Sequence, residues 1–245
     1  MYVNPRDLFV SSLLIRDLKY EEFESSLLER MLAPGAVFVD VGAQIGYYTS
    51  LAAMACGDAG CVYAFEPNIT NFRILLKNIE LNKFANVVVC QKAVSKEESH
   101  SLLYIDSFNL GKHSLSENNV TAIDELEGVQ PVETTSLDWF MRSVGQKRVD
   151  VLKIDAEGAE GLVIDGALGL LAEHDVTIFM EVWPFGQRNL GTDPDVMLSK
   201  LDALGYTCWL IDETTDRLRK LEDRNEVCKG NEPRRSFNLL LRKIS

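Results

Sequence analysis

Hydrophobic residues along the chain follow two alternating patterns, short apolar runs and longer stretches with a helical period. The run at 36–41 is continuous and rich in β-branched residues, whereas 70–82 places Phe72, Leu75 and Ile79 on one helical face. Continuous apolar runs are typical of strands that are buried on both faces. The patterns predict strands at 36–41, 61–65, 87–90, 149–154, 176–180, 206–211 and 237–241, and helices at 21–32, 48–55, 70–82, 163–171 and 194–204.

The alternation of these strands and helices predicts an α/β fold in which a mainly parallel sheet carries helices on both faces. We expect a single domain over residues 1–245, with a leading helical segment at 1–35 and an α/β core at 36–245. The stretch at 94–133 is polar and interrupts the pattern. Because long loops without secondary structure are uncommon, we expect short strands or a helix inside it, near 102–105.

The charge of the chain narrows the classes of partner. Asp and Glu number 37 against 25 Lys and Arg, a formal net charge of −12. Phosphate backbones and anionic membranes repel such a surface, so neither nucleic acid nor a membrane is expected as a partner. The five cysteines are odd in number and form no C-x-x-C pair, and no signal peptide is recognisable. A cytoplasmic protein is therefore predicted, and its oligomeric state is left open.

Candidate chemistry gathers where the predicted strands end, because ligands of parallel sheets bind at the carboxyl ends of the strands. The first strand ends at Asp40 and is followed by a loop with the pattern G-x-x-x-G, from Gly42 to Gly46. Glycines let a ligand approach the backbone closely. The charge of Asp40 would oppose a diphosphate but would suit a ligand with an ammonium or sulfonium group. A tight turn without a ligand is the alternative.

Two further strand ends carry carboxylates. Glu66 lies about 20 residues beyond the glycine loop, the spacing at which an acidic residue holds the hydroxyls of a ribose. Asp155 ends the fourth strand and is expected to face the glycine loop and the substrate. Glu157 and Glu160 follow it, and acids are also typical of a solvated first turn of a helix. Either role is open for these two residues at this point.

These segments resemble the FkbM family of S-adenosylmethionine-dependent methyltransferases. The matching segments are DVGAQIGYYT at 40–49, FEPN at 65–68, AVS at 93–95, TTSLDWF at 134–140 and VLKIDAEGAE at 151–160. The family usually has Asn where Gln44 stands and Val where Ala156 stands. The similarity extends from about residue 21 to the last predicted strand.

The resemblance implies a Rossmann-like, seven-stranded sheet of the class I methyltransferase type with its last strand antiparallel. It also implies methyl transfer from S-adenosylmethionine, most typically to an oxygen of a small molecule or sugar. The residues expected to bind the cofactor are Asp40, Gly42, Ala43, Gln44, Gly46, Thr49, Glu66, Pro67, Asn68, Ala93 and Asp155.

Methyl transfer to a hydroxyl requires removal of its proton, so a general base is expected near the acceptor. The candidates, in order of preference, are Asp155, Glu157, Glu181 and His113. His113 lies in the polar segment, where an exposed loop histidine would be usual. Asp155 and Glu181 could also share a divalent cation, but we assign no metal site.

Two other enzyme classes share features with this chain. A short-chain NAD-dependent oxidoreductase needs a Lys four residues after a Tyr, and none of the seven Tyr residues has one. An N-methyltransferase acting on nucleic acid or another amine would usually follow the Asn or Asp of the fourth strand with two prolines, which are absent after Asp155. A non-catalytic protein that had lost the cofactor would be expected to lose Glu66 or a loop glycine.

Overall fold

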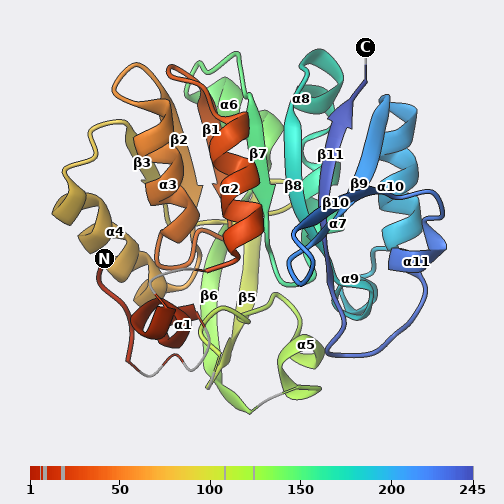
Figure 1. The fold of residues 1–245 in the computed structure, drawn as a ribbon. Helices are drawn as coiled ribbons and strands as arrows, with labels where there is room; N and C mark the ends of the chain where they lie inside the picture. Colours follow the sequence, from red (N-terminus) through yellow and green to blue (C-terminus); the bar gives the residue numbers. More distant parts are fainter. Residues whose placement is uncertain (6, 8–9, 18–19, 108, 124, 245) are drawn as a thin grey trace.

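The main sheet carries the strands predicted from the apolar runs. In the computed structural model, which describes residues 1–245 except 6, 8–9, 18–19, 108, 124 and 245, eight strands are ordered β10-β9-β11-β8-β7-β1-β2-β3 (Figure 1). Their bounds are β1 Val37–Val41, β2 Cys61–Phe65, β3 Val87–Cys90, β7 Val151–Ile154, β8 Thr177–Val182, β9 Tyr206–Asp212, β10 Arg217–Lys220 and β11 Phe237–Lys243. Strands β3, β2, β1, β7 and β8 are parallel, and β11 runs antiparallel between β8 and β9.

The sheet has one strand more than the seven predicted. The extra strand, β10, pairs antiparallel with β9 at the edge of the sheet, and all four of its residues are exposed. Its sequence, RLRK, is mostly charged, as is common for a strand at an open sheet edge. It therefore contains no apolar run from which the strand could be predicted. The turn between the two strands brings the carboxylate of Glu213 to the backbone N–H groups of Phe23 and Glu24, where it caps the leading helix.

Alternate residues of each strand build two cores, because successive side chains point to opposite faces. Val39, Leu152 and Ile178 belong to one core, whereas Phe38 and Phe179 belong to the other. Helices α2 Glu22–Met31, α3 Tyr47–Cys56 and α4 Ile69–Asn82 lie over the second face (Figure 1). The other face is covered by α6 Leu137–Ser143, α7 Glu160–Asp165, α8 Leu168–Glu173 and α10 Pro194–Ala203.

The helix predicted at 163–171 is divided into α7 and α8. The break falls at Gly166, where a Cβ atom would lie 2.2 Å from the backbone oxygen of Ser95. The chain therefore turns at this glycine to pack against the start of the insertion. The short helices α1 Val10–Asp17, α5 Glu117–Thr121, α9 Pro184–Asn189 and α11 Asn225–Cys228, together with α6, are additions to the predicted set.

The irregular segment forms a second, three-stranded sheet. Its strands are β4 Ala93–Val94, β5 Ser99–Asp106 and β6 Leu126–Thr135, in the order β4-β6-β5. The strand expected near 102–105 is part of β5. This sheet, α1 and α5 all lie at the end of the main sheet to which β1 and β2 point (Figure 1). The insertion is therefore placed over the carboxyl ends of the parallel strands.

Two predictions concern the environment of the protein. No helix among the described residues is long and apolar enough to cross a membrane. The five cysteines are free thiols, two of them buried and three partly buried against the core or at its edge. A cytoplasmic location stays a prediction.

Candidate active site

The turn after β1 is shaped by three residues with positive φ. Gly42 and Gly46 have φ values of 85° and 89°, and Gln44 has a φ of 50°. A Cβ atom on Gly42 would lie only 1.9 Å from the carbonyl oxygen of Asp155. The glycine therefore lets the ends of β1 and β7 touch, which brings Asp155 to the glycine loop as the sequence predicts.

Asp40 is held from behind by the first turn of α3. Its side chain is 2% exposed and accepts a hydrogen bond from the Thr49 hydroxyl at 2.5 Å. Burial raises the pKa of Asp40 to about 6, against the lowering effect of this hydrogen bond. Thr49 is fully buried, so its contact is with Asp40 and not with the cavity. Thr49 is a positioning residue.

Glu66 is fixed by two backbone donors. One carboxylate oxygen accepts from Gln44 N and the other from Asn68 N, both at 2.8 Å. Burial raises the pKa of Glu66 to about 7. The Asn71 side chain also hydrogen-bonds to this carboxylate, whose four lone pairs still leave an acceptor position for a ligand. The Asn68 side chain caps α4 by accepting from Thr70 N and Asn71 N, so it positions this helix and does not line the cavity.

These residues surround one cavity with two adjoining lobes. The first lobe contains Glu66, Pro67, Ala93 and His113, and the second contains Asp40, Ala43 and Glu181. Gly42, Gln44, Asp155 and Glu157 line both lobes. The leading segment and the insertion complete the second lobe through Tyr20, Glu21, Asn109 and Lys112.

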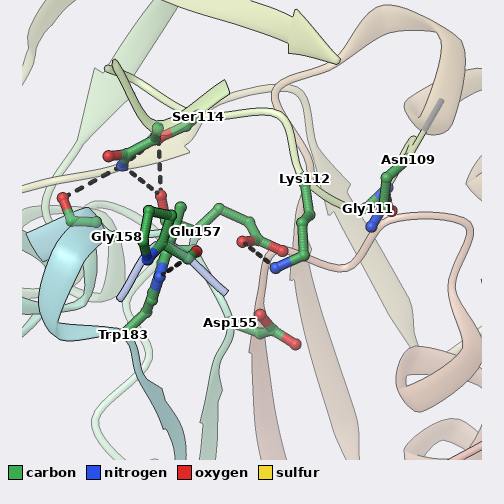
Figure 2. Close-up of polar contacts among 12 residues, drawn as sticks. Asn109, Gly111, Lys112, Ser114, Asp155, Glu157, Gly158 and Trp183 are labelled. Atoms are coloured by element: carbon green, nitrogen blue, oxygen red, sulfur yellow. Dashed lines mark hydrogen bonds and ion pairs between the residues drawn. The ribbon is translucent and has the colours of Figure 1, made fainter. Parts of the chain in front are cut away.

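Three carboxylates meet where the lobes join. One oxygen each of Asp155, Glu157 and Glu181 lie within 4.8 Å of one another. Lys153 Nζ lies 3.3 Å from Asp155 Oδ2. Lys112 Nζ lies 3.7 Å from Glu157 Oε2, as Figure 2 shows. Burial raises the pKa of Glu181 to about 7 and that of Glu157 well above its ordinary value. The cluster can hold a proton or a cationic group.

Glu157 and Glu160 are not solvated residues at a helix start. Glu160 is fully buried, and its carboxylate accepts from Ala156 N at 3.1 Å, Gly158 N at 3.0 Å and the Gln187 side chain at 3.2 Å. It therefore fixes the turn after β7. The sequence could not show this, because Gln187 and the insertion that cover the turn are distant in the chain.

The loop at 109–116, here called the capping loop, crosses the turn after β7. Ser114 Oγ donates to the Glu157 carbonyl at 2.7 Å, and Asn119 Nδ2 donates to the same oxygen at 3.2 Å (Figure 2). His113 belongs to this loop, and the expectation of an exposed histidine is wrong. Its Nε2 atom is buried beside the first lobe, and its Nδ1 accepts from Asp106 N at 3.1 Å.

Several charged residues near the cluster were missed in the sequence. Lys153 is 4% exposed, lies 3.4 Å from Glu24 Oε1 and stands 4.5 Å from the ring centre of Tyr48. Burial would lower the pKa of Lys153, but the carboxylates of Asp155, Glu24 and Glu21 together hold it well above its usual value. A lysine inside the apolar strand VLKI is the signal that could have revealed this network. Trp183 does not line the cavity: it is 2% exposed and lies outside both lobes.

Comparison with known proteins places this site in a family. A curated relative, Methyltransferase 1 of Beauveria bassiana (strain ARSEF 2860), is 30% identical in an alignment of 151 residues that covers 56% of this chain and 59% of the relative. The structure of methyltransferase FkbM from Methylobacillus flagellatus KT is similar with a TM-score of 0.51 and 14% identity, covering 90% of this chain and 51% of that one. The chain thus spans little more than half the length of these relatives.

Two further structures share the fold. An S-adenosylmethionine-dependent O-methyltransferase from Thermotoga maritima has a TM-score of 0.50 and 14% identity, covering 95% of this chain and 70% of its own. An rRNA methylase from Streptococcus thermophilus has a TM-score of 0.50 and 12% identity, covering 93% and 99%. At these identities the likeness shows the fold alone, so the acceptor must be argued from the site.

The family assignment itself rests on the sequence motifs. The family model described as the methyltransferase FkbM domain matches residues 40–208, which begin at Asp40 of the glycine loop and include Glu66, Asp155 and Glu181. This match covers more than half of the chain and excludes the alternative interpretation as an NAD-dependent oxidoreductase. The chain belongs to the FkbM family of methyltransferases, whose methyl donor and cofactor is S-adenosylmethionine.

Proposed function

We propose that this chain transfers the methyl group of S-adenosylmethionine to a hydroxyl oxygen of a small molecule or sugar. The observation that carries the proposal is a buried carboxylate oxygen, Glu181 Oε2, without a hydrogen-bond partner among the described residues. It belongs to the carboxylate cluster and lines the same cavity as Gly42 and Asp40. A proton acceptor therefore lies beside the motifs that characterise the family.

The residues of the cavity suit the cofactor. The remaining acceptor position of Glu66 matches a ribose hydroxyl, and Asp40 lies where a cationic amino-acid end would be stabilised. Gly42 and Ala43 leave the backbone of the loop open to close approach. When bound, S-adenosylmethionine supplies a methyl group on a positively charged sulfur, which the surrounding carboxylates favour.

Glu181 is the best base of the cluster in this structure. Asp155 Oδ2 is paired with Lys153, and Glu157 Oε2 faces Lys112, so both carboxylates are partly neutralised. Glu157 Oε2 and Glu181 Oε2 both lack a hydrogen-bond partner among the described residues, but Glu157 has the ammonium group of Lys112 within 4 Å, and burial brings the pKa of Glu181 to about 7. A general base is most effective when its pKa lies near the working pH. We therefore place Glu181 ahead of Asp155, Glu157 and His113 as the group that takes the proton.

The reaction balances with a single base. Glu181 would take the hydroxyl proton of the acceptor while the hydroxyl oxygen forms a bond to the methyl carbon. The bound cofactor would supply that methyl group, and the electron pair of the broken carbon–sulfur bond would stay on its sulfur. The protein must hold the acceptor oxygen in line with the breaking bond. For well-oriented reactants such positioning can lower the barrier by about 7 to 11 kcal/mol.

The second lobe favours a compact acceptor over a nucleic acid. Tyr20, Tyr47 and Tyr48 line it, with ring centres 5.2 to 6.5 Å apart and edge-to-face packing. Aromatic rings with polar edges suit the mixed apolar and hydroxylated surface of a sugar. The carboxylates of the lobe and the net charge of −12 would repel a phosphate backbone.

The test combines a labelled methyl donor with a set of small hydroxylated compounds and monosaccharides. We expect label on oxygen, and we expect Glu181→Gln to lower kcat by about 10² or more while binding of the methyl donor is unchanged. Glu173→Gln, which removes an exposed carboxylate, is the matched control. Label confined to amines or to RNA, or a Glu181→Gln variant as fast as the control, would contradict the proposal.

A further inference from the structure

The capping loop contributes the side chain of His113 to the lining of the first lobe. His113 is held there by the backbone of β5, because Asp106 N donates to His113 Nδ1 at 3.1 Å. A neutral imidazole has one donor and one acceptor nitrogen. Since Nδ1 accepts, the hydrogen of the ring must be on Nε2. His113 therefore presents an N–H donor, and this nitrogen cannot take a proton from a substrate.

This donor has no partner of its own. His113 Nε2 is buried and makes no hydrogen bond among the described residues. Burial lowers the pKa of His113 to about 4, so the ring is neutral at physiological pH. A buried N–H group without a partner costs free energy, which is recovered only when a ligand or water accepts from it.

The surroundings of His113 indicate what would accept. Leu103, Leu110 and Leu115 give the lobe apolar walls, and Pro67 and Glu66 lie in the same lobe. A second unpartnered atom, Asn71 Oδ1, belongs to a side chain that is 2% exposed. An apolar lobe with one buried donor, one buried acceptor and a ribose-binding carboxylate suits a flat heteroaromatic ring attached to a ribose.

The loop that carries His113 is attached to the other walls of the lobe. Asn71 Nδ2 donates to the Leu110 carbonyl at 2.8 Å, which joins α4 to the capping loop. Ser114 joins the same loop to the turn after β7 through the Glu157 carbonyl. Both attachments fix the position of His113 relative to Glu66, so the donor is preorganised for a ligand that Glu66 also binds.

We propose that His113 is an adenine-binding residue, whose Nε2–H donates a hydrogen bond to a ring nitrogen of the cofactor's adenine. The inference rests on the proposed function, because it takes S-adenosylmethionine as the ligand of the first lobe. It assigns His113 to recognition of the adenosine and removes it from the candidate bases. A ribose hydroxyl is already served by Glu66, and a carboxylate would be disfavoured beside Glu66 and Glu157.

The experiment uses calorimetric titration with S-adenosylhomocysteine and its 1-deaza, 3-deaza and 7-deaza analogues, in which one adenine nitrogen is replaced by carbon. The unmodified protein should bind one of the three analogues about 5 to 30 times more weakly than S-adenosylhomocysteine, the factor expected for loss of one hydrogen bond. His113→Phe, which keeps an aromatic ring without the donor, should lose a similar factor for S-adenosylhomocysteine. The His113→Phe variant should bind the weaker analogue as tightly as it binds S-adenosylhomocysteine.

The controls separate this inference from the proposed function. His100→Ala, in the exposed part of β5, should bind all four ligands like the unmodified protein. If the unmodified protein binds none of them, the proposed function fails. If it binds all four equally, or if His113→Phe shows the same loss for the analogue as the unmodified protein, the adenine contact is wrong. The comparison of ligands on the unmodified protein decides the matter even if His113→Phe does not fold.

Discussion

The turns after β1 and β7 lie side by side and have similar backbone conformations. The sequence predicted the role of the turn after β1 more completely than that of the turn after β7. Each contains a non-glycine residue in the left-handed region, Gln44 with φ 50° and Glu157 with φ 49°. Each also contains a glycine whose Cβ would collide with backbone, Gly42 against Asp155 and Gly158 against Gly186. Both turns present carboxylates to the same cavity.

The two turns differ in how far along the chain their supporting contacts come from. Asp40 and Glu66 are held within one βαβ unit, by Thr49 and by backbone N–H groups at most 22 residues away. The turn after β7 is covered by Ser114, which is 43 residues from Glu157. Local support leaves a readable spacing in the sequence, whereas support from an insertion does not. The same carboxylate pattern therefore suggested a ligand site in one case and allowed a solvated helix start in the other.

The largest effect is expected where the two turns touch. Gly42→Ala adds a Cβ 1.9 Å from the Asp155 carbonyl at a φ of 85°, so backbone must shift. We expect a loss of more than about 3 kcal/mol in the free energy of unfolding, measured by urea titration. Gly145→Ala, at a φ of 70° with no atom within 4 Å of the new Cβ, should lose only about 1 kcal/mol. Equal losses would mean that the contact between the turns is not tight.

A smaller effect is expected from the carboxylate that organises the turn after β7. Glu160→Ala leaves Ala156 N, Gly158 N and the Gln187 amide without their acceptor. We expect about 2 to 3 kcal/mol of destabilisation, and less for Glu160→Gln, which keeps one acceptor oxygen. The exposed control Glu173→Gln should change stability by less than about 0.5 kcal/mol. If the Glu160→Ala variant is as stable as this control, Glu160 is a solvated residue at the start of a helix after all.

Stability is also expected to depend on pH. Burial raises the pKa of Glu160 to about 8 and that of Glu66 to about 7, from an ordinary value of 4.5. Between about pH 5 and pH 8 the folded protein holds more protons than the unfolded chain, so the free energy of unfolding falls as pH rises. Because one pKa unit corresponds to about 1.4 kcal/mol, we expect a fall of several kcal/mol across this window, followed by a plateau.

Urea titrations at pH 5 and pH 8 measure this difference. Glu160→Gln removes one of the buried groups and should reduce the fall, whereas Glu173→Gln removes the same charge from the surface and should not. This pair separates burial from the general repulsion of a chain with a net charge of −12. Stability that rises over the same window would show that the buried carboxylates are ionised in the folded protein.

The sequence predictions are correct for features that depend on nearby residues and wrong for features that depend on residues far apart in the chain. The strands 61–65 and 87–90 are observed with the predicted bounds, because apolar β-branched runs favour strands both in the buried interior, where β2 lies, and at the edge of the sheet, where β3 lies with Val88 exposed. Strand β10 was missed, since its exposed residues carry no pattern of burial. His113 was expected to be exposed because its neighbours are polar, yet His113 itself is bound to β5 and its neighbour Ser114 to the turn after β7.

The sequence by itself determined the α/β order of the core, the glycine loop and the alignment of Asp40, Glu66, Asp155 and Glu181 at strand ends. These features depend on periodicity, glycine conformation and residue spacing, which are local properties. Only the tertiary structure decided that Glu157 and Glu160 are buried, that Lys153 is paired with Glu24 and Asp155, and that His113 presents a donor to the cavity. Burial and pairing are made by segments far apart in the chain, so they become definite only when the insertion and the leading helix pack over the ends of the strands.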